Sequence, residues 1–489
     1  MDQDVGLWTR LSWMRFFGFI DAIKPPIVHL FIASRRYNRP MKKIKTGGLR
    51  RRFAIGAAGA RGGLSLLSSK ASGLLLPKDK QHAHHQAALE REAMRFVKEL
   101  GELKGAYVKI GQMLALYGEH LLPKPVTDAL HTLEAQTTEL EWSVIEPHLQ
   151  VVFAEKLKGL SIQADSFAAA SLAQVHMASA CNINEPVCIK IQYPGIAGAI
   201  EDDFRNVTQM LTLARWIKSG RQLEELTREL KMQLMREVDY CYELKTAKLV
   251  GEKLANDSRY RVPKYYSDLS NESVLTMEFI DGYEVTHRNV QALSQTRRNA
   301  LALSMLDLFF VEAFDWALMQ TDPNFGNYRI IIDQNGDQDQ LGLLDFGAVH
   351  HLADSFTKPL RKTILAAHDG DLEQTIEGAI ELGCLRESDS RRVKTSFAEF
   401  CAFILEPFSS DISKLPDFCK TADNLYDWRT SRLLKRAGKL GSEGMLVKGF
   451  VIPPAEFMLM VRKLTGVFTF VSTLGAQLDS AFLLEKYRE

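Results

Sequence analysis

The most informative part of this 489-residue chain is the stretch from Gln320 to Gly347, QTDPNFGNYRIIIDQNGDQDQLGLLDFG. Asp322 is followed five positions later by Asn327, and Asp345 begins an Asp-Phe-Gly triplet at the end of the stretch. Two short β-type runs, YRIII and LGLL, lie between them and are separated by the polar turn DQNGDQDQ. A hairpin of this kind brings the loop before it and the Asp-Phe-Gly after it together, so we expect Asp322, Asn327 and Asp345 to lie close in space.

This arrangement is typical of phosphotransferases of the protein-kinase type, which gather one catalytic Asp and two oxygen ligands for Mg²⁺. Asp322 would face the attacking group, and Asn327 and Asp345 would hold the metal that bridges the phosphates of a nucleotide. Carboxylate and amide oxygens suit a hard ion. The expected cofactors are therefore ATP and Mg²⁺ or Mn²⁺. The alternative is a solvated acidic hairpin without a catalytic role.

Composition predicts a folded globular protein of more than one domain, since 46% of the residues are apolar and 25% are charged. The net charge of +1 hides a segment from Ala22 to Lys78 that is rich in Lys and Arg and contains no Asp or Glu. Residues 1–50 mix aromatic and basic residues, which suits contact with an anionic membrane surface. A basic arm packed on the body, or a disordered one, is the alternative.

Other features limit the class of protein. The first ten residues carry two acidic residues and no apolar core, so we expect no signal peptide. No uncharged apolar run reaches the roughly 18 residues that a membrane-spanning helix needs. The nearest, Leu464 to Leu478, is expected to be a buried helix. The six cysteines form no CxxC pair and are expected to be reduced thiols in the core.

A second block supplies the other half of a nucleotide site. The run VCIKI predicts a strand with Lys190 near its middle, ended by Pro194-Gly195. A Lys on an apolar strand needs a partner, and in kinases this Lys holds the α- and β-phosphates and pairs with a Glu on the helix that follows. The run MREVDYCYELKTA offers Glu237 and Glu243, which we expect near one end of a helix, each reaching a different lysine.

Two further segments complete that half of the site. The loop before the Lys190 strand would cover the phosphates, and it carries Ala168, Ala169, Ala170 and Ser171 where a protein kinase has glycines. Alanine restricts φ, so the backbone would lie less closely over the phosphates. The run VLTMEFIDG at 274–282 predicts a strand and turn whose Glu278 and Phe279 would take the adenine edge.

The motifs occur in one order that resembles the UbiB (AarF) family of atypical protein-kinase-like proteins, over roughly residues 86–480. They are KIGQ at 109–112, AAASLAQVH at 168–176, CIKIQYPG at 188–195, EVDY at 237–240, MEFIDG at 277–282, QTDPNFGN at 320–327 and LLDFG at 343–347. The resemblance implies an α+β, protein-kinase-like two-lobe fold, with a small β-rich lobe, a large helical lobe and an N-terminal helical extension that carries KxGQ. It implies regulatory or inhibitory roles for the motif residues Lys109, Gly111, Gln112, Glu237, Asp239 and Glu243. We assign Glu243 to Lys190 and Glu237 to Lys109.

The resemblance also implies a function. It implies nucleotide binding with a divalent metal, ATPase activity, weak or absent protein phosphorylation, and support of ubiquinone biosynthesis or related lipid metabolism at a membrane. The expected partners are an anionic membrane surface or an isoprenoid lipid and quinone-biosynthesis enzymes, and no nucleic acid. The expected location is cytoplasmic with peripheral membrane association, at the inner membrane if the source is bacterial and mitochondrial if it is eukaryotic.

The predicted domains are a basic N-terminal arm at 1–85, the helical KxGQ extension at 86–150, a kinase-like N-lobe at 151–282 and a kinase-like C-lobe at 283–489. The helical region is expected to begin near Gln86, with HAHH at 82–85 as a linker.

Departures from the protein-kinase pattern all concern phosphorylation of a substrate. Asn324 stands where protein kinases usually carry a Lys that steadies the transferring phosphoryl group, and Gln320-Thr321 replaces the usual His-Arg. No Ala-Pro-Glu follows Gly347. Three functions remain open: an atypical ATPase or kinase for quinone-lipid synthesis, a phosphotransferase acting on a small molecule, and a nucleotide-responsive scaffold that binds lipid.

Overall fold

The computed structural model describes residues 78–103, 105–117, 122–135, 139–214, 216–217, 221–336, 338–444 and 453–488. These residues form two compact units, and the division falls inside one helix. The sheet unit comprises the described residues of 78–245 and 264–279, and the helical unit comprises those of 246–263 and 280–488. Residues 1–77, with the stretch predicted to contact a membrane, lie outside the described residues.

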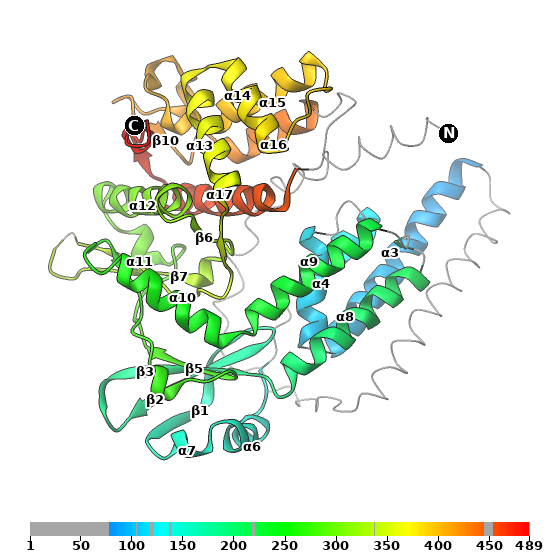
Figure 1. Ribbon diagram of the computed structural model, residues 1–489, viewed down its shortest axis with the longest axis vertical. Coiled ribbons are helices and arrows are strands. Elements are labelled where there is room, and N and C mark those ends of the chain that lie inside the picture. Colours follow the sequence, from blue (N-terminus) through cyan, green and yellow to red (C-terminus); the bar gives the residue numbers. More distant parts are fainter. Residues whose placement is uncertain are drawn as a thin grey trace. The chain divides into compact units, whose positions relative to one another are not determined.

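The sheet unit is built on a four-stranded antiparallel sheet in the order β1-β2-β3-β5 (Figure 1). Its strands are β1 (Leu160–Ala169), β2 (Ala173–Ala180), β3 (Ile183–Gln192) and β5 (Val274–Glu278). Val187, Ile189 and Ile191 alternate along β3 and are fully buried, as one face of a covered sheet requires. Pro194 lies just beyond β3, and Gly195, with φ of +72°, precedes the next helix. The two strands predicted here, around Lys190 and at 274–282, are confirmed.

Helices make up the rest of the sheet unit. They are α3 (Lys78–Leu103), α4 (Ala106–Tyr117), α5 (Lys124–Leu130), α6 (Trp142–Val152), α7 (Ala154–Leu157), α8 (Ile196–Leu213), α9 (Arg221–Glu237) and α10 (Tyr240–Lys253), with short 3₁₀ turns η2 (His131–Ala135) and η3 (Ser267–Leu269). Helix α4 packs against α3, α5, α8 and α9. One buried apolar cluster includes residues of these helices and of the sheet, among them Leu100, Ile110, Ile189 and Phe204.

The N-terminal helix begins earlier than predicted. Helix α3 starts at Lys78 rather than near Gln86, and residues 82–85, predicted to be a linker, belong to it. The reason is local: the segment from Lys78 to Gln86 contains neither Gly nor Pro, and the nearest helix-breaking residue upstream is Pro77.

The helical unit contains the hairpin predicted from the sequence. Strand β7 (Tyr328–Ile331) pairs antiparallel with β8 (Gln340–Leu343), and β4 (Tyr260–Arg261) pairs parallel with the outer edge of β8. Strand β6 (Leu318–Gln320) pairs antiparallel with β9 (Val349–His351), and β10 (Tyr426–Asp427) with β11 (Gln477–Leu478). The β6–β9 pair joins the segment before the hairpin to the segment after it.

The rest of the helical unit consists mainly of helices (Figure 1). They are α11 (Arg288–Gln291), α12 (Gln295–Phe310), the π-helical turn η4 (Val311–Asp315), α13 (Asp354–Asp369), α14 (Leu372–Glu381), α15 (Arg391–Ile404), α16 (Leu433–Gly444), α17 (Ala455–Leu474) and α18 (Phe482–Glu485), with 3₁₀ turns η5 (Phe325–Asn327), η6 (Glu406–Phe408), η7 (Ile412–Lys414) and η8 (Asp417–Cys419). Helices α13, α14 and α15 pack on one another, and α12 and α17 lie side by side.

Helix α17 occupies the region predicted to be a buried helix. Pro454 is its N-cap and Gly475, with φ of +61°, ends it, so the predicted helix stops at Leu474 rather than Leu478. Among the residues that the structure describes, it is the one helix long and apolar enough to cross a membrane by length and composition. In this structure α17 packs against α12 and buries Lys463, whose side chain is 1% exposed.

The six cysteines are free thiols, as predicted, but not all lie in the core. Cys181 and Cys241 are exposed, because Cys181 lies in the turn between β2 and β3 and Cys241 in the first turn of α10. Burial raises the pKa of the Cys188 thiol to about 12, so this neighbour of Lys190 stays protonated near neutral pH.

Candidate active site

Lys190 and Glu243 form a closed ion pair in the sheet unit. Lys190 projects from β3, and its Nζ lies 2.9 Å from both carboxylate oxygens of Glu243 in the first turn of α10. The Glu243 side chain is 1% exposed and the Lys190 side chain 16%. The Tyr240 ring lies 5.2 Å from the same Nζ, which adds a cation–π contact. The predicted pairing of Lys190 with Glu243 is confirmed.

A second ion pair joins the KxGQ helix to α9. Lys109 Nζ on α4 lies 2.5 Å from Glu237 Oε1 at the end of α9, so this predicted pairing is also confirmed. The prediction that Glu237 and Glu243 share one end of a helix is wrong, because the chain breaks between α9 and α10. Asp239 causes the break: its Oδ1 accepts a hydrogen bond from the Tyr242 N–H, as an N-cap does.

The other KxGQ residues act within the extension. A Cβ added at Gly111 would collide with the Leu133 side chain, so only glycine allows α4 and η2 to approach this closely. The Gln112 side chain donates a hydrogen bond to the Leu133 carbonyl at 3.2 Å. These contacts hold η2 on α4 and thereby fix the helix that carries Lys109. The regulatory role predicted for Gly111 and Gln112 stays a prediction.

The Ala-rich loop is the turn of the β1–β2 hairpin. Ala168 and Ala169 end β1 opposite Val175 and Gln174, and the Ala170 N–H donates to the Ala173 carbonyl at 2.8 Å. The Tyr193 hydroxyl donates to the Ala170 carbonyl at 3.0 Å. Ser171 lies in the bend that follows. Hydrogen bonds at Ala170 therefore tie the turn to Ala173 and to Tyr193, the residue directly after β3.

The residues after this loop have a structural role that the sequence analysis missed. Gln174 accepts a hydrogen bond from the Leu140 N–H at 3.0 Å and donates to the Leu140 carbonyl at 3.3 Å. His176 Nδ1 lies 2.7 Å from the Gln163 carbonyl, and its Nε2 lies 2.8 Å from the Gln174 amide nitrogen. Both side chains are buried. The motif AQVH thus fastens β2 to β1 and to the segment before α6.

The predicted adenine-binding residues lie at the end of β5. The N–H groups of Glu278 and Phe279 donate to the carbonyls of Lys264 and Pro186 at 2.8 and 2.9 Å, so neither is available for adenine. A contact with adenine would instead use carbonyl groups or the Phe279 ring. Phe167, directly before the Ala-rich loop, is 56% exposed and packs edge-on against Phe279, with ring centroids 5.3 Å apart.

In the helical unit, the β6–β9 pair and the β7–β8 hairpin bring the three predicted residues to one place. The Leu344 N–H donates to the Asn327 carbonyl at 2.9 Å, which sets Asp345 beside Asn327. The Gln320 side chain accepts from the Asp322 N–H at 2.6 Å and donates to the Asp345 carbonyl at 3.2 Å. The predicted proximity is confirmed, and Gln320, noted only as a departure from the kinase pattern, is the residue that links the two aspartates.

The Asp322 carboxylate is held on both oxygens. Asn327 Nδ2 donates to Oδ2 at 3.0 Å, and the Arg462 guanidinium on α17 lies 2.9 Å from Oδ1. Asp322 is 30% exposed and Arg462 17%. The sequence analysis did not single out Arg462. Its place on α17, 140 residues after Asp322, left no local pattern to find.

A buried ion pair lies behind this loop. Lys463 Nζ is 2.9 Å from Glu312 Oε2 and 3.3 Å from the Tyr328 hydroxyl. Burial lowers the pKa of Lys463, but the Glu312 carboxylate and the Tyr328 hydroxyl outweigh burial and hold it above its ordinary value. The sequence analysis missed this pair as well. The only signal available was a Lys within an apolar helix, which must find a partner.

The donor set around Asn327 and Asp345 fits a divalent cation. The amide nitrogen of Asn327 donates a hydrogen bond to Asp322. The amide oxygen of Asn327, which is the atom that a hard ion prefers, therefore points away from this hydrogen bond. Asp345 Oδ1 accepts a hydrogen bond from the Gly347 N–H at 2.9 Å, which orients the carboxylate. In the described part of the chain, no three His, Cys, Asp or Glu gather to hold a metal. A cation here would therefore need nucleotide phosphates and water to complete its ligands.

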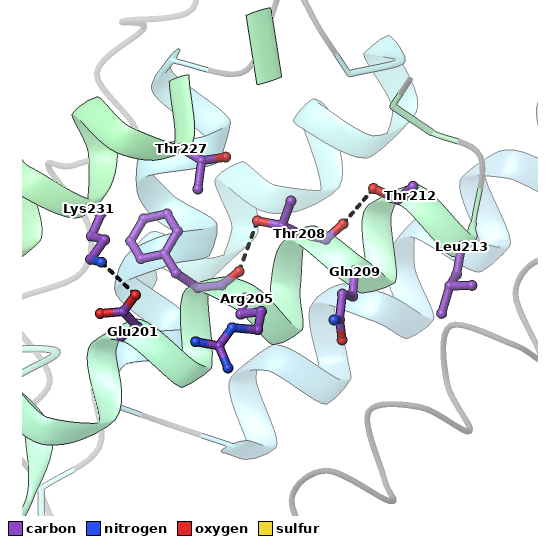
Figure 2. A pocket seen from close by; sticks show the side chains of 9 residues that line it. Glu201, Arg205, Thr208, Gln209, Thr212, Leu213, Thr227 and Lys231 are labelled. Atoms are coloured by element: carbon purple, nitrogen blue, oxygen red, sulfur yellow. Dashed lines mark hydrogen bonds and ion pairs between the residues drawn. The ribbon is translucent and has the colours of Figure 1, made fainter. Parts of the chain in front are cut away.

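A groove of about 600 Å³ lies elsewhere, on the surface of the sheet unit between α8 and α9 (Figure 2). None of its lining residues belongs to the motifs discussed above. Figure 2 shows Lys231 of α9 directed to Glu201 of α8, an ion pair of 2.8 Å. The hydroxyls of Thr208 and Thr212 donate to carbonyls one helical turn earlier. These polar groups already serve the helices, so the groove is not the candidate site.

Comparison with known proteins decides the family. A family model described as the ABC1 atypical kinase-like domain matches residues 133–379, just over half of the chain. This chain belongs to the ABC1 atypical kinase-like family. Among its ABC1 relatives, "Atypical kinase COQ8, mitochondrial" of Schizosaccharomyces pombe is 29% identical over 88% of this chain and 66% of its own length. "Atypical kinase COQ8B, mitochondrial" of Rattus norvegicus is 28% identical over 89% of this chain and 80% of its own length.

A solved structure has a similar fold. The complex of Rv3197 with erythromycin from Mycobacterium tuberculosis has a TM-score of 0.55 and 22% sequence identity, and covers 84% of this chain and 98% of its own. The predicted family resemblance and the kinase-like α+β fold class are therefore confirmed. By membership of the ABC1 family, the chain is an ATP-dependent atypical kinase-like enzyme. The roles assigned to individual residues stay predictions.

Proposed function

We propose that this protein binds Mg-ATP and hydrolyses it, with little or no protein kinase activity, and that it supports isoprenoid-quinone (ubiquinone) biosynthesis at a membrane. One observation carries the catalytic part of the proposal. Gln320 and the strand pairs bring Asp322, Asn327 and Asp345 together in one unit, and these are the residue types that a kinase-type phosphotransferase uses for catalysis and metal binding.

Each residue has a role in this proposal. Lys190, fixed by Glu243, neutralises the charge of the nucleotide phosphates. Asn327 and Asp345 hold the divalent ion, which when bound supplies Lewis-acid neutralisation of phosphate charge. Asp322 orients the attacking group, since its carboxylate is held in one position by Asn327 and Arg462. The Ala-rich turn at 168–171 covers the phosphates, and Glu278 and Phe279 lie at the adenine.

Several features support hydrolysis over transfer to a protein. Position 324, where protein kinases carry a phosphate-steadying Lys, is Asn, and its side chain accepts a hydrogen bond from the Gly326 N–H at 2.9 Å. Strand β9 and helix α13 follow the Asp-Phe-Gly almost at once, so the chain has little length for a loop that docks a peptide. A small acceptor, such as water, needs no such loop.

The role in quinone synthesis rests on the relatives. Several are named atypical kinase COQ8, and those names place them in mitochondria. We propose the same setting for this chain if its source is eukaryotic, and an inner membrane if it is bacterial. The nucleotide would then drive an event on an isoprenoid lipid or on the enzymes that process it.

Replacing the principal metal ligand tests the proposal. In Asp345→Asn, a divalent ion loses its only anionic protein ligand, so Mg-dependent ATP binding and phosphate release should fall to background. Binding is measured by calorimetry with and without Mg²⁺, and phosphate release with and without anionic liposomes. Asp354→Asn is the control, because Asp354 is an exposed carboxylate of the same unit, 80% exposed.

Two results would contradict the proposal. Wild-type Mg-ATP affinity in Asp345→Asn would remove Asp345 from the metal site. Phosphate that appears on an added metabolite, rather than in solution, would replace hydrolysis by transfer to a small molecule.

A further inference from the structure

The loop that carries Asp322 lacks a cation of its own. Asn324 occupies the position of the kinase Lys, and its Oδ1 caps the 3₁₀ turn η5 by accepting from the Gly326 N–H. A neutral side chain used in this way cannot balance charge on a phosphoryl group. Transfer of a phosphoryl group relies on positive charge at its nonbridging oxygens, so a cation for this purpose must come from elsewhere in the chain.

Arg462 brings a cation to this place from α17. Its Nη2 lies 2.9 Å from Asp322 Oδ1, while Asn327 takes the other oxygen at 3.0 Å. An Arg retains its charge at any physiological pH and offers five donors in a planar fork. The guanidinium therefore brings a permanent positive charge to the side of the Asp322 carboxylate.

The surroundings of α17 fix Arg462 in this position. The next residue, Lys463, is 1% exposed and bonded to Glu312 in the π-helical turn η4. One turn further on, Gly466 packs directly against Pro323, where a Cβ would collide. Phe470 contacts Phe325, with ring centroids 5.7 Å apart. Four positions on one helix thus contact the Asp322 loop or its support.

We infer that Arg462 supplies the phosphoryl-binding cation that position 324 lacks. The inference rests on the proposed function, because it assigns Arg462 to the terminal phosphate of the bound nucleotide. In hydrolysis, a water oxygen forms a bond to the terminal phosphorus, and the bond from that phosphorus to the bridging oxygen breaks. ADP leaves with the electron pair, and the Asp322 carboxylate accepts the proton of the water. Arg462 keeps its protons and stabilises the charge on the nonbridging oxygens.

The test compares two variants of Arg462 in the full chain. Arg462→Gln removes the charge, and Arg462→Lys retains it with fewer donors. Wild type should bind Mg-ATP more tightly than Mg-ADP, and Arg462→Gln should lose this preference together with roughly 100-fold in phosphate release, the effect of losing one preorganised donor. Arg462→Lys should recover part of both. Calorimetry with each nucleotide and a phosphate-release assay give the two readouts.

Arg436→Gln is the matched control. Arg436 is also a part-buried Arg of the helical unit, paired with Glu406 at 2.7 Å, but it contacts none of the motif residues described above. The Arg436→Gln variant should keep the ATP preference and the phosphate-release rate of wild type. Thermal melting of the Arg462 and Arg436 variants shows whether both lose stability.

The outcomes separate this inference from the proposed function. If Arg462→Gln keeps the preference for ATP over ADP, or if wild type shows none, the inference is overturned. Equal behaviour of Arg462→Lys and Arg462→Gln would also overturn it, because charge would not matter. If wild type releases no phosphate, the proposed hydrolysis fails, and the nucleotide preference alone decides the role of Arg462.

Discussion

Several charged side chains in this protein are buried or nearly buried. Glu243 is nearly fully buried, and Lys190 donates to both of its carboxylate oxygens. Removing one member of a buried pair typically costs about 3–5 kcal/mol, because the other charge is left without compensation. Lys190 therefore contributes to the stability of the sheet unit as well as to the charge it would offer a phosphate.

At the same scale, His176 predicts a dependence of stability on pH. Burial lowers the pKa of His176 below its ordinary value of 6.5, although the Gln163 carbonyl, Glu139 and Asp165 oppose this. The folded protein thus binds fewer protons than the unfolded chain, so the stability from neutral His176 is present above about pH 6.5 and is lost as pH falls toward the folded pKa. The free energy of unfolding should fall by at most about 1.4 kcal/mol per pH unit in that window.

Denaturant unfolding of wild type and His176→Gln between pH 7.5 and roughly pH 5 checks this. The variant should lose part of the pH dependence, because Gln does not titrate. His351→Gln, at an exposed position in β9, is the control. Equal slopes in wild type and His176→Gln would show that this histidine does not protonate on unfolding.

Residues differed in how far they could be predicted. The partners of Lys190 and Lys109 could be predicted, because each Lys and each Glu lies in one of the short sequence motifs. Arg462, Lys463 and Glu312 could not be found in this way, since their contacts join α17 to segments more than a hundred residues away. Gln174 and His176 lay within a quoted motif, but only the fold shows that they bond to Leu140 and Gln163.

At the scale of elements, the strands were predicted better than the helix ends. The hairpin β7–β8 and strands β3 and β5 follow from apolar runs bounded by turn residues. The break between α9 and α10 was missed, although Asp239 followed by a helical run is a recognisable N-cap. The predicted start of α3 is too late because residues 82–85 were interpreted as a linker, although no helix-breaking residue lies between Lys78 and Gln86.

Helix α17 predicts a sharp response to one added methyl group. Gly466→Ala should clash with Pro323 and lower the free energy of unfolding by about 1–3 kcal/mol. Phosphate release should fall as well, because Pro323 is next to Asp322. Thermal melting and the phosphate assay measure the two effects.

Gly198→Ala in α8 is the control for this change. A Cβ at Gly198 meets nothing within 4 Å, so alanine there should be neutral or stabilise by up to about 1 kcal/mol. If Gly466→Ala melts no lower than Gly198→Ala, α17 and the Pro323 loop are not in tight contact.

At the scale of the whole molecule, the fold class was predictable because the motifs occur in one order along the chain. The boundaries predicted at residues 150 and 282 stay predictions. The sheet unit contains both the KxGQ helices and the sheet, and its two stretches flank a segment of the helical unit. Sequence motifs mark sites, whereas compact units depend on long-range packing, so the two need not divide a chain at the same residues.

The predicted membrane contact is also tested on the whole chain. Removing residues 1–77 should leave nucleotide binding intact, since every motif lies after them, and should reduce binding to anionic vesicles and any lipid-stimulated hydrolysis together. Each Lys or Arg near such a surface is worth about 1 kcal/mol, and the attraction is screened beyond about 8 Å at physiological salt. Binding should therefore weaken steeply as salt rises, with a remainder due to Trp8, Trp13, Phe16 and Phe17.

Co-sedimentation with anionic liposomes over a salt series decides this. A full-length variant with Arg50, Arg51 and Arg52 replaced by Gln is the control for charge alone, and should show a smaller salt dependence. If the truncated chain pellets as well as the full chain, the N-terminal segment is not the anchor, and α17 becomes the next segment to test.

The position of α17 in the chain has a consequence for biosynthesis. A ribosome makes Asp322 and Arg462 140 residues apart, so the hairpin and the Asp-Phe-Gly exist before the helix that supports them. Until α17 has left the ribosome, Pro323, Phe325 and Tyr328 lack their packing partners and Glu312 lacks Lys463. Such exposed apolar groups are where chaperones bind a growing chain. The loop that carries Asp322 is thus completed late, and a prematurely terminated chain would contain the motif residues without the helix that positions them.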